Sequence, residues 1–290
     1  MTDAGGVVAG RPPIGGTTRT LGVIGWPVDQ SLSPAIHNAA IAALGLDLVY
    51  VALPVAPGDV RPALEGLAAL GFVGANVTMP HKTEASGIVD ERSDDAARLD
   101  AVNTIVVTAD GLVGHNTDAP GFDRMLRHDE MVDPAGRHAL LYGAGGAARA
   151  VALALARGGA ERVTVVVRDP GRAAPVVNAL AGLDTAVEVV GFDEAPGVSA
   201  ELLVNATPLG AHGEELPTPP LTASTTVIDL LYRPVLTPLI ARARAAGATA
   251  AGGMGLLLHQ AALSFELWTG QVPPLEVMSA AAVAAVGERP

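Results

Sequence analysis

The stretch Leu140-Leu-Tyr-Gly-Ala-Gly-Gly-Ala-Ala148 decides the fold of this chain. It has the form G-x-G-x-x-A and lies between an expected strand, 137–142, and an expected helix rich in Ala and Leu, 147–157. This is the context that a dinucleotide-binding turn requires. Gly143 permits the tight turn, Gly145 lets the backbone approach a pyrophosphate, and the last alanine keeps the helix close to the sheet. The stretch predicts a Rossmann-type, doubly wound α/β domain, although an ordinary glycine-rich turn would have the same local form.

The end of the next expected strand, 162–167, indicates which dinucleotide is bound. NAD sites usually carry an acidic residue about 20 residues after the glycine motif, where it bonds the ribose 2′-hydroxyl. Here that position holds Arg168, and Arg172 follows four residues later. Two guanidinium groups suit a 2′-phosphate, so the sequence favours NADP. Two alternatives stay open: Asp169 could accept a bond from the 2′-hydroxyl of NAD, or both arginines are solvated surface charges.

The composition excludes several classes of protein. The chain has 290 residues, 49% of them hydrophobic, which is enough for one large or two ordinary domains. The absence of cysteine excludes disulfides and any Cys-based metal site or nucleophile. A net charge of −12 argues against nucleic-acid binding. No apolar run approaches the roughly 20 residues of a membrane span, and residues 1–19 lack the features of a signal peptide. We therefore expect a disordered tail over 1–19, a cytoplasmic protein and no metal.

The remaining chain alternates strands and helices, which implies a mainly parallel sheet in a first domain as well. Asp110-Gly111 predicts a hairpin turn between two strands, and Pro120-Gly121 predicts a hinge into the second domain. In the first domain, strands are expected at 20–25, 48–53, 72–78, 102–107 and 112–114, and helices at 33–44, 57–70 and 81–90. Later strands are expected at 188–190, 202–205 and 227–230, with helices at 256–268 and 276–286.

Two serines stand at the expected start of the first helix. Ser31 and Ser33 precede Pro34, a residue that suits the first turn of a helix. Hydroxyls at a helix N-terminus form a small anion site, suitable for a substrate carboxylate. The alternative is that Ser33 only caps its helix.

Lys82 is the only lysine in a chain with 17 arginines. Arginine stays protonated at any working pH, whereas lysine can lose its proton. A single lysine therefore fits a group that exchanges a proton, although a surface lysine kept by chance is the alternative.

Other polar residues are expected at the ends of neighbouring strands. Asn76 and Thr78 lie two residues apart on one face of a strand, while Asn103 and Asp118 stand in short segments beside other strands. Each alone could be a turn or cap residue. Together with Lys82 they predict a polar site at the carboxyl ends of the strands, where open α/β sheets bind ligands.

From about residue 20 to 274 the sequence resembles the shikimate dehydrogenase family. Eight short blocks match in the same order, which is far more specific than any one of them. The family often has Asn-Arg-Thr where this chain has Val167-Arg168-Asp169. The matching blocks are Ser31-Leu-Ser-Pro-Ala-Ile-His-Asn38, Gly74-Ala-Asn-Val-Thr-Met-Pro-His-Lys82, Ala101-Val-Asn-Thr104, Asn116-Thr-Asp118, Gly143-Ala-Gly-Gly-Ala-Ala148, Asn205-Ala-Thr-Pro208, Asp229-Leu-Leu-Tyr232, and Gln260 before Phe265.

The resemblance implies an organisation and a set of residue roles. A substrate-binding and catalytic domain would span 20–120 and a Rossmann domain 121–253, with the C-terminal helices of 254–290 packing on the first domain. Lys82 and Asp118 would form the catalytic pair. Substrate would be held at its carboxylate by Ser31, Ser33 and Tyr232, and at its ring hydroxyls by Thr78, Asn103, Asp118 and Gln260, with Asn76 nearby. Cofactor would be bound by Gly143, Ala144, Gly145, Gly146, Ala147, Val167, Arg168, Arg172, Leu230 and Gly253. The family pattern also suggests a cofactor contact for Asp94, which is unexpected for an anionic ligand.

The implied activity is the reversible, NADPH-dependent reduction of 3-dehydroshikimate to shikimate in aromatic amino acid biosynthesis. The expected partners are small molecules, with no nucleic acid and no membrane, and the expected assembly is a monomer or homodimer. Two alternatives remain: a quinate dehydrogenase of the same fold that prefers NAD, and a catalytically inactive dinucleotide-binding module with a regulatory role.

Overall fold

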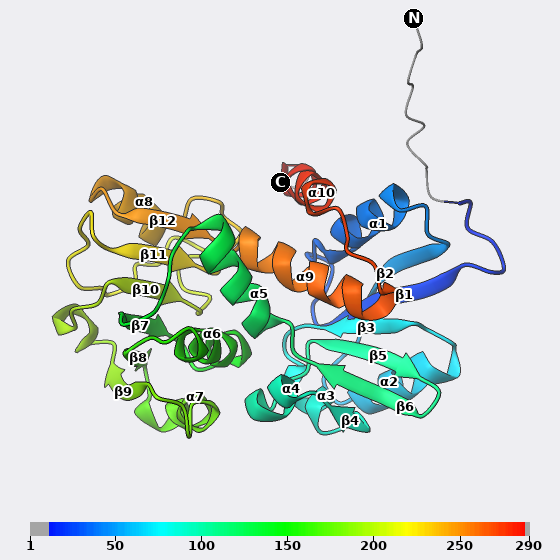
Figure 1. Cartoon of the computed structure of the whole chain (residues 1–290), viewed down its shortest axis with the longest axis horizontal. Coiled ribbons are helices and arrows are strands. Elements are labelled where there is room, and N and C mark those ends of the chain that lie inside the picture. Colours follow the sequence, from blue (N-terminus) through cyan, green and yellow to red (C-terminus); the bar gives the residue numbers. More distant parts are fainter. Residues whose placement is uncertain (1–11, 288–290) are drawn as a thin grey trace, which may run out of the picture. The chain divides into compact units, whose positions relative to one another are not determined.

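The computed structural model describes residues 12–287, and the chain within it divides into two compact units (Figure 1). Unit 1 joins the residues up to Thr117 with those from Ala261 onward, and unit 2 is Asp118–Gln260. Each unit is built around its own six-stranded sheet. The α/β class that the sequence predicts is confirmed.

The sheet of unit 1 is mixed. Its strand order is β2-β1-β3-β5-β6-β4, and β2, β1 and β3 run parallel to one another. The predicted hairpin at Asp110-Gly111 is confirmed, because β5 and β6 are antiparallel neighbours on either side of it. The strands are β1 Arg19–Gly25, β2 Leu48–Pro54, β3 Gly74–Val77, β4 Glu91–Arg92, β5 Thr104–Thr108 and β6 Gly111–His115.

Helices cover this sheet, including two from the C-terminal part of the chain. α10 packs against α1, although the two are far apart in sequence. Leu64 of α2 packs with Ile24, Val77 and Ile105 of the strands in one buried cluster. The helices of unit 1 are α1 Ser33–Ala43, α2 Val60–Ala69, α3 Lys82–Ser86, α4 Asp94–Leu99, the later turns of α9 Met254–Thr269, and α10 Leu275–Gly287.

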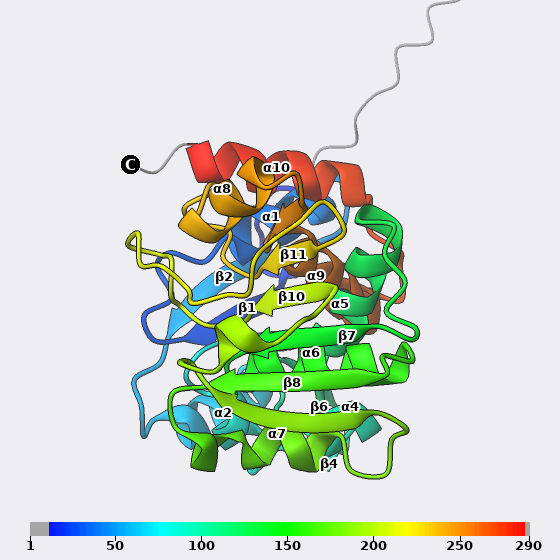
Figure 2. The same cartoon turned by 90° about the vertical axis from the view of Figure 1, so that its left-hand side faces the viewer.

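Unit 2 is a parallel sheet with the order β12-β11-β10-β7-β8-β9. When β7 to β12 are numbered 1 to 6 and the sheet is read from β9 to β12, this is the 3-2-1-4-5-6 order of Rossmann folds. The Rossmann prediction is therefore confirmed. Figure 2 shows β10, β7 and β8 side by side. Alternate residues face opposite cores: Leu141 and Val165 belong to one buried cluster, and Leu140 and Val166 to the other. The strands are β7 His138–Tyr142, β8 Arg162–Val167, β9 Ala186–Gly191, β10 Leu202–Asn205, β11 Thr226–Asp229 and β12 Thr249–Gly252.

The helices of unit 2 lie on both faces of its sheet. α6 supplies Val151 and Leu155 to one core, and α8 supplies Leu239 and Ala243 to the other. The helical elements are α5 Asp118–Arg124, a π-helical turn Met125–Asp129, α6 Gly146–Arg157, the 3-10 turn η2 Pro170–Ala173, α7 Ala174–Ala179, the 3-10 turn Ala195–Gly197, α8 Pro238–Ala245 and the first turns of α9.

Several boundaries differ from the sequence predictions. The helix expected over 81–90 ends at Ser86, because Gly87 closes α3, and the chain then forms β4 and α4. Ser93 caps α4 by accepting a bond from the Ala96 amide, 3.3 Å. The expected hinge at Pro120-Gly121 lies inside α5. β12 and α8 were not predicted at all, although Thr237 before Pro238 is a helix-start signal.

The expected tail over 1–19 falls only partly within the described residues, since 1–11 lie outside them. Arg19 already belongs to β1. The hydroxyls of Thr17 and Thr18 donate to Asp47, at 2.8 and 2.6 Å, so this end of the expected tail is attached to unit 1.

Within residues 12–287 we find no helix that is both long and apolar enough to cross a membrane.

Candidate active site

In unit 1 the strand order reverses between β1 and β3, because the chain goes from β1 to β2 on one side and then returns to β3 on the other side of β1. The carboxyl ends of β1 and β3 lie at this point. Open α/β sheets bind ligands at such points. The two strands stay bonded beyond their ends: Thr78 N–H donates to Ile24 C=O, 2.8 Å, and Trp26 N–H to Met79 C=O, 3.2 Å. A Cβ on Gly25 would collide with the Thr78 side chain. Glycine is therefore needed for this close approach.

Ser31 and Ser33 follow β1 at this edge. Leu32 occupies the N-cap position of α1, and Ser33 is already the first helical residue without a side-chain capping bond. The interpretation of Ser33 as the N-cap is therefore wrong by one residue. Instead the Ser31 hydroxyl accepts a bond from Ser33 N–H, 3.2 Å. With no acidic residue in its first turn, the start of α1 suits an anion such as a carboxylate.

Lys82 follows β3 at the same edge, as the half-buried first residue of α3. Its backbone carbonyl accepts from Val102 N–H, 2.9 Å. This bond ties the start of α3 to the segment that leads into Asn103.

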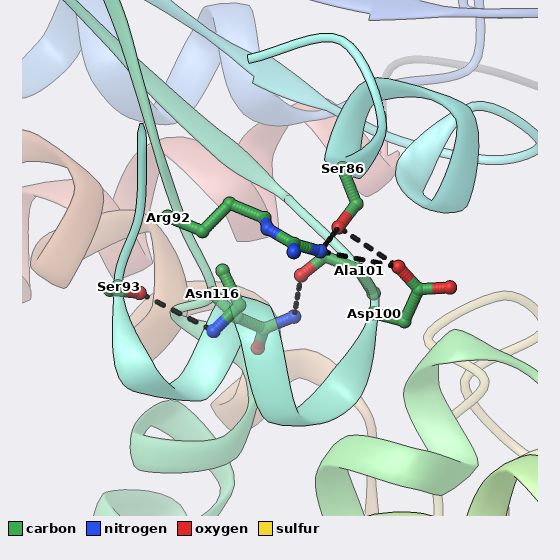
Figure 3. Close-up of polar contacts among 7 residues, drawn as sticks. Ser86, Arg92, Ser93, Asp100, Ala101 and Asn116 are labelled. Carbon is green, nitrogen blue, oxygen red and sulfur yellow. Dashed lines mark hydrogen bonds and ion pairs between the residues drawn. The ribbon is translucent and has the colours of Figure 1, made fainter. Parts of the chain in front are cut away.

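A group of polar contacts holds the loop before β5 (Figure 3). Asp100 adopts a left-handed conformation, φ +46°, at the end of α4. Its carboxylate accepts from the Ser86 hydroxyl, 3.2 Å, and that hydroxyl also accepts from Arg92, 3.1 Å. On the other side Asn116 donates to the carbonyl of Ala101, 3.0 Å. The loop is thus fixed on two sides immediately before β5 begins.

Asn103 is the residue just before β5, and it is buried. Because β5 is antiparallel to β3, its start lies at the carboxyl edge of β3. Asn103 N–H donates to His115 C=O, 3.0 Å, and its own carbonyl accepts from Val77 N–H, 2.8 Å. Its side-chain amide bonds Thr104 and Thr117. Backbone and side chain are both fixed.

Asn76 lies beneath this edge with its amide surrounded by protein groups. The carboxamide oxygen accepts from the Tyr50 hydroxyl, 2.7 Å. The amide nitrogen lies 3.0 Å from the Asn103 carbonyl, 3.2 Å from the Thr104 hydroxyl and 3.0 Å from the Ser264 hydroxyl. Sequence reasoning missed Tyr50, Thr104 and Ser264, since a single polar residue in an apolar strand or helix carries no signal of its partners.

His37 lies under Tyr50 in an aromatic stack. The two rings are nearly parallel, with centroids 4.3 Å apart, and Phe265 and Trp268 are further ring neighbours. His37 is fully buried, and neither ring nitrogen has a hydrogen-bond partner of good geometry. Burial lowers the pKa of His37 to about 3, and the nearby Asn76 amide opposes only part of that shift. Burial also raises the pKa of Tyr50, which the neighbouring Ser33 hydroxyl partly opposes.

Three further residues predicted to bind substrate belong to unit 2. Asp118 is the buried first residue of α5. Gln260 lies in α9, where Gly121 of α5 allows the two helices to meet: a Cβ there would be 2.9 Å from the Gln260 nitrogen. Burial raises the pKa of Tyr232, and Arg233 partly opposes the shift.

The glycine turn of unit 2 follows β7 and begins α6. Gly143 has φ +109°, and a Cβ on it would lie 3.1 Å from the Ala206 carbonyl after β10. β7 and β10 are the neighbours between which the sheet order reverses, so the turn stands at the expected binding point. A Cβ on Gly145 would meet no protein atom within 4 Å. That open space, beside a helix start with no acidic first-turn residue, fits a pyrophosphate.

Arg168 and Arg172 flank a tight turn at the end of β8. In the part of the chain that the structure describes, neither guanidinium forms an ion pair, whereas Arg162 is 2.6 Å from Glu188. Asp169 accepts a bond from Gly171 N–H, 3.0 Å, and thereby caps η2. One carboxylate oxygen is therefore engaged in forming the turn that carries both arginines.

Leu230 and Gly253 are brought together in unit 2. Leu230 follows β11, and its amide donates to Asn205 C=O, 2.9 Å. A Cβ on Gly253 would collide with the Leu230 carbonyl, so only glycine allows this contact. Two residues that the family resemblance assigns to cofactor binding are thus direct neighbours.

The predicted residues fall into two groups, one on each unit. Unit 1 carries the first group at one sheet edge: Ser31, Ser33, Asn76, Thr78, Lys82 and Asn103. Unit 2 carries Asp118, Tyr232 and Gln260 together with all the predicted cofactor residues. Among the described residues no group of three or more His, Asp or Glu side chains is arranged to hold a metal ion.

Comparison with known proteins gives consistent matches. Residues 23–105 match the family described as "Shikimate dehydrogenase substrate binding domain", and residues 253–283 match "Shikimate 5'-dehydrogenase C-terminal domain". Over 271 residues, the chain is 43% identical to the shikimate dehydrogenase (NADP(+)) of Methanopyrus kandleri, covering 90% of this chain and 93% of that protein.

Solved structures agree. The shikimate 5-dehydrogenase of Thermus thermophilus, in complex with NADP(H) and shikimate, superposes with a TM-score of 0.82 at 37% identity, covering 92% of this chain and 99% of that one. The quinate dehydrogenase of Corynebacterium glutamicum, in complex with NAD, gives a TM-score of 0.84 at 34% identity, with coverage of 92% and 99%.

Proposed function

The chain belongs to the shikimate dehydrogenase family, and from that premise we propose that it catalyses the reversible, NADPH-dependent reduction of 3-dehydroshikimate to shikimate, a step of aromatic amino acid biosynthesis. One observation carries the proposal. The hydroxyls of Ser31 and Ser33, the Thr78 hydroxyl and the only lysine follow two adjacent strands, β1 and β3, at one edge of the unit-1 sheet.

The substrate is an anionic ring with hydroxyl groups, and the proposed contacts divide accordingly. Ser31 and Ser33, with Tyr232, bind the carboxylate; this fits the helix start at α1, where no acidic side chain competes. Thr78, Asn103, Asp118 and Gln260 bind the ring hydroxyls. The Asn76 amide already has four protein partners, which favours an orienting role for it over direct contact.

Lys82 and Asp118 are the proposed catalytic pair. When bound, NADPH supplies the hydride that forms the new C–H bond at C3 of the substrate. Lys82 donates a proton to the C3 oxygen as the C=O double bond opens, and regains a proton from solvent. Asp118 accepts hydrogen bonds from the same region of the substrate and orients the ammonium group of Lys82. General acid help of this kind contributes about 10²–10⁴-fold.

The residues of unit 2 fit NADP. Gly145 leaves open space at the start of α6, and Arg168 and Arg172 have no ion-pair partner among residues 12–287. Two unpaired guanidinium groups at this position favour a 2′-phosphate over a 2′-hydroxyl. The use of an Asp169 oxygen as a cap weakens the alternative in which this carboxylate selects NAD.

The test is a spectrophotometric assay of the purified full chain with shikimate and quinate, each with NADP and NAD. We expect the highest kcat/KM for shikimate with NADP. A higher kcat/KM for quinate, or for NAD, would establish the alternative of a quinate dehydrogenase. No turnover of any pair, together with dinucleotide binding in calorimetry, would establish the inactive module instead.

We also propose a cytoplasmic location, because an enzyme that consumes NADPH needs a compartment where other reactions regenerate it. For the assembly we propose a monomer or homodimer. Light scattering on the purified chain tests the assembly, and a larger oligomer would contradict it.

A further inference from the structure

Four side chains in unit 1 form a closed ring of hydrogen bonds. The ring runs from Asn103 Nδ2 to Thr117 Oγ1, 2.9 Å, and from there to Ser264 Oγ, 3.2 Å. It continues from Ser264 Oγ to Thr104 Oγ1, 2.7 Å, and returns to Asn103 Oδ1, 3.0 Å. Ser264 comes from α9, whereas the other three residues come from the β5–β6 hairpin and its ends. The ring therefore joins two parts of the chain that are far apart in sequence.

One backbone amide fixes which way the Asn103 carboxamide faces, and this allows one consistent direction of donation around the ring. Thr117 N–H donates to Asn103 Oδ1, 2.8 Å, and a backbone N–H can only donate. The carboxamide oxygen of Asn103 must therefore face Thr117 N–H and Thr104, and its NH₂ group must face the Thr117 hydroxyl. The Thr117 hydroxyl, which accepts there, lies 3.2 Å from both Ser264 Oγ and Asn103 Oδ1. Because Asn103 Oδ1 already accepts from Thr117 N–H and Thr104, the Thr117 hydroxyl can donate to Ser264, Ser264 to Thr104, and Thr104 to Asn103. Each hydroxyl donates once, and the ring closes without a conflict.

The ring is shielded from water. Thr104 and Ser264 are 0% exposed, Asn103 2% and Thr117 3%. Water cannot easily replace a lost partner at such a site, and hydrogen bonds there strengthen one another. Removing one hydroxyl is expected to leave the remaining side chains of the ring free to change their orientation.

The ring includes one residue of the proposed site and a chain neighbour of another. Asn103 is a proposed substrate ligand, and Thr117 is bonded directly to Asp118 in the chain. Ser264 closes the ring, and it also lies 3.0 Å from the amide nitrogen of Asn76. We propose that Ser264 is a positioning residue: its hydroxyl, acting through Thr104 and Thr117, holds the Asn103 amide in the orientation that binds substrate. This inference rests on the proposed function, because it assigns Ser264 to the same site.

The helix itself has no need of serine at this position. Alanine is the better helix former, and Ala261, Phe265 and Trp268 already supply the apolar contacts of this face. The variant Ser264→Ala is therefore expected to fold. A purely structural serine would affect stability without affecting one substrate selectively.

The experiment compares Ser264→Ala, Thr104→Val and the double variant with the unmodified chain. In each single variant we expect KM for shikimate to rise about tenfold, the equivalent of one hydrogen bond of about 1.4 kcal/mol, while KM for NADP and kcat change much less. Because both hydroxyls act on Asn103 through the same ring, the double variant should resemble either single variant. The matched control is Thr269→Val in the same helix, whose hydroxyl donates to the carbonyl of Phe265, 2.8 Å; it should leave both KM values unchanged.

A second measurement does not depend on turnover. The side-chain NH₂ protons of Asn103, assigned by NMR from their loss in Asn103→Ala, should be protected from exchange in the unmodified chain and about tenfold less protected in Ser264→Ala. Unchanged protection, multiplied KM effects in the double variant, or a Ser264→Ala variant that behaves like Thr269→Val would overturn the inference. A chain with protected Asn103 protons and no shikimate turnover would refute the proposed function instead.

Discussion

The two units hold their candidate ligand-binding groups by different means. In unit 1 the groups are side chains, and buried hydrogen bonds from residues such as Thr104, Thr117 and Ser264 fix their orientation. In unit 2 the glycine turn offers backbone amides. Gly143 is favoured by its φ of +109°, and Gly253 is required because a side chain would collide with the Leu230 backbone. Arg168 and Arg172, by contrast, are exposed and form no ion pair within residues 12–287. Unit 1 should therefore be sensitive to the loss of single buried polar groups, and unit 2 to changes of backbone shape and surface charge.

The largest expected effect concerns Lys82. We predict that Lys82→Arg lowers kcat nearly as much as Lys82→Ala, by roughly 10²-fold or more, because arginine keeps the charge but cannot give up a proton at neutral pH. Shikimate affinity should change much less, since Ser31, Ser33 and Asn103 remain. Steady-state kinetics give kcat, and calorimetry gives Kd. Near-normal turnover by the Lys82→Arg variant would show that the lysine acts only as a charge.

A smaller effect is expected from His37, whose pKa burial lowers to about 3. Between that value and the ordinary pKa near 6.5, the unfolded state binds a proton that the folded state excludes, so stability falls as pH falls through this window and is fully present above it. From pH 8 to pH 5 we expect the unfolding free energy to drop by about 2 kcal/mol, roughly thirtyfold in the unfolding constant. His37→Phe should remove this slope while keeping the stack on Tyr50.

Denaturant titrations at several pH values test the His37 prediction, and tryptophan fluorescence is the suitable probe. Both tryptophans, Trp26 and Trp268, belong to unit 1, and the Trp268 ring centroid lies 5.4 Å from that of His37. If stability changed equally with pH in the unmodified protein and in His37→Phe, the buried imidazole would not titrate in this way. Carboxylates with lowered pKa, such as Asp47, affect both chains alike and cancel in the comparison.

The smallest expected effect concerns the exposed arginines of unit 2. Replacing Arg168 and Arg172 with alanine should raise KM for NADP about tenfold and leave KM for NAD nearly unchanged, because exposed charge pairs contribute little each. Arg162→Ala, which removes an arginine already paired with Glu188, is the control. Asp169→Asn keeps a capping side chain and should leave NADP affinity unchanged or improved. Equal losses for both cofactors in the double variant would refute recognition of the 2′-phosphate.

The sequence predicts the sheet of unit 2 well because its strands are apolar on both faces and its glycine turn is specific. β8 and β10 have the predicted bounds. β12 escaped prediction because its Thr-Ala-Ala-Gly sequence has no β-branched run. In unit 1 the helix expected over 81–90 is only five residues long, because pairing of β4 with β6 overrides the local preference after Gly87.

In the candidate site too, some features could be predicted from the sequence and others could not. Ser31, Thr78 and Lys82 could be predicted to share an edge, because parallel strands end on the same side of a sheet. The partners that orient Asn103 could not be predicted, since Ser264 reaches Thr104 across 160 residues of sequence. Contacts of that kind depend on tertiary packing, and no local pattern in α9 marks which of its residues faces the hairpin.

The division of the chain has a consequence for the order in which it can fold during synthesis. Unit 2 is continuous in sequence, whereas unit 1 needs residues from Ala261 onward, including Ser264, Phe265 and Trp268 of its buried interior. A ribosome adds about 5–20 residues per second, so the first part of unit 1 waits on the order of ten seconds, while unit 2 emerges, before its interior can be completed. During that interval the Asn103 amide lacks its ring-closing hydroxyl, and the apolar side of the first sheet lacks the helix that covers it. Unit 2, synthesised later, can therefore be complete before the unit whose synthesis began first.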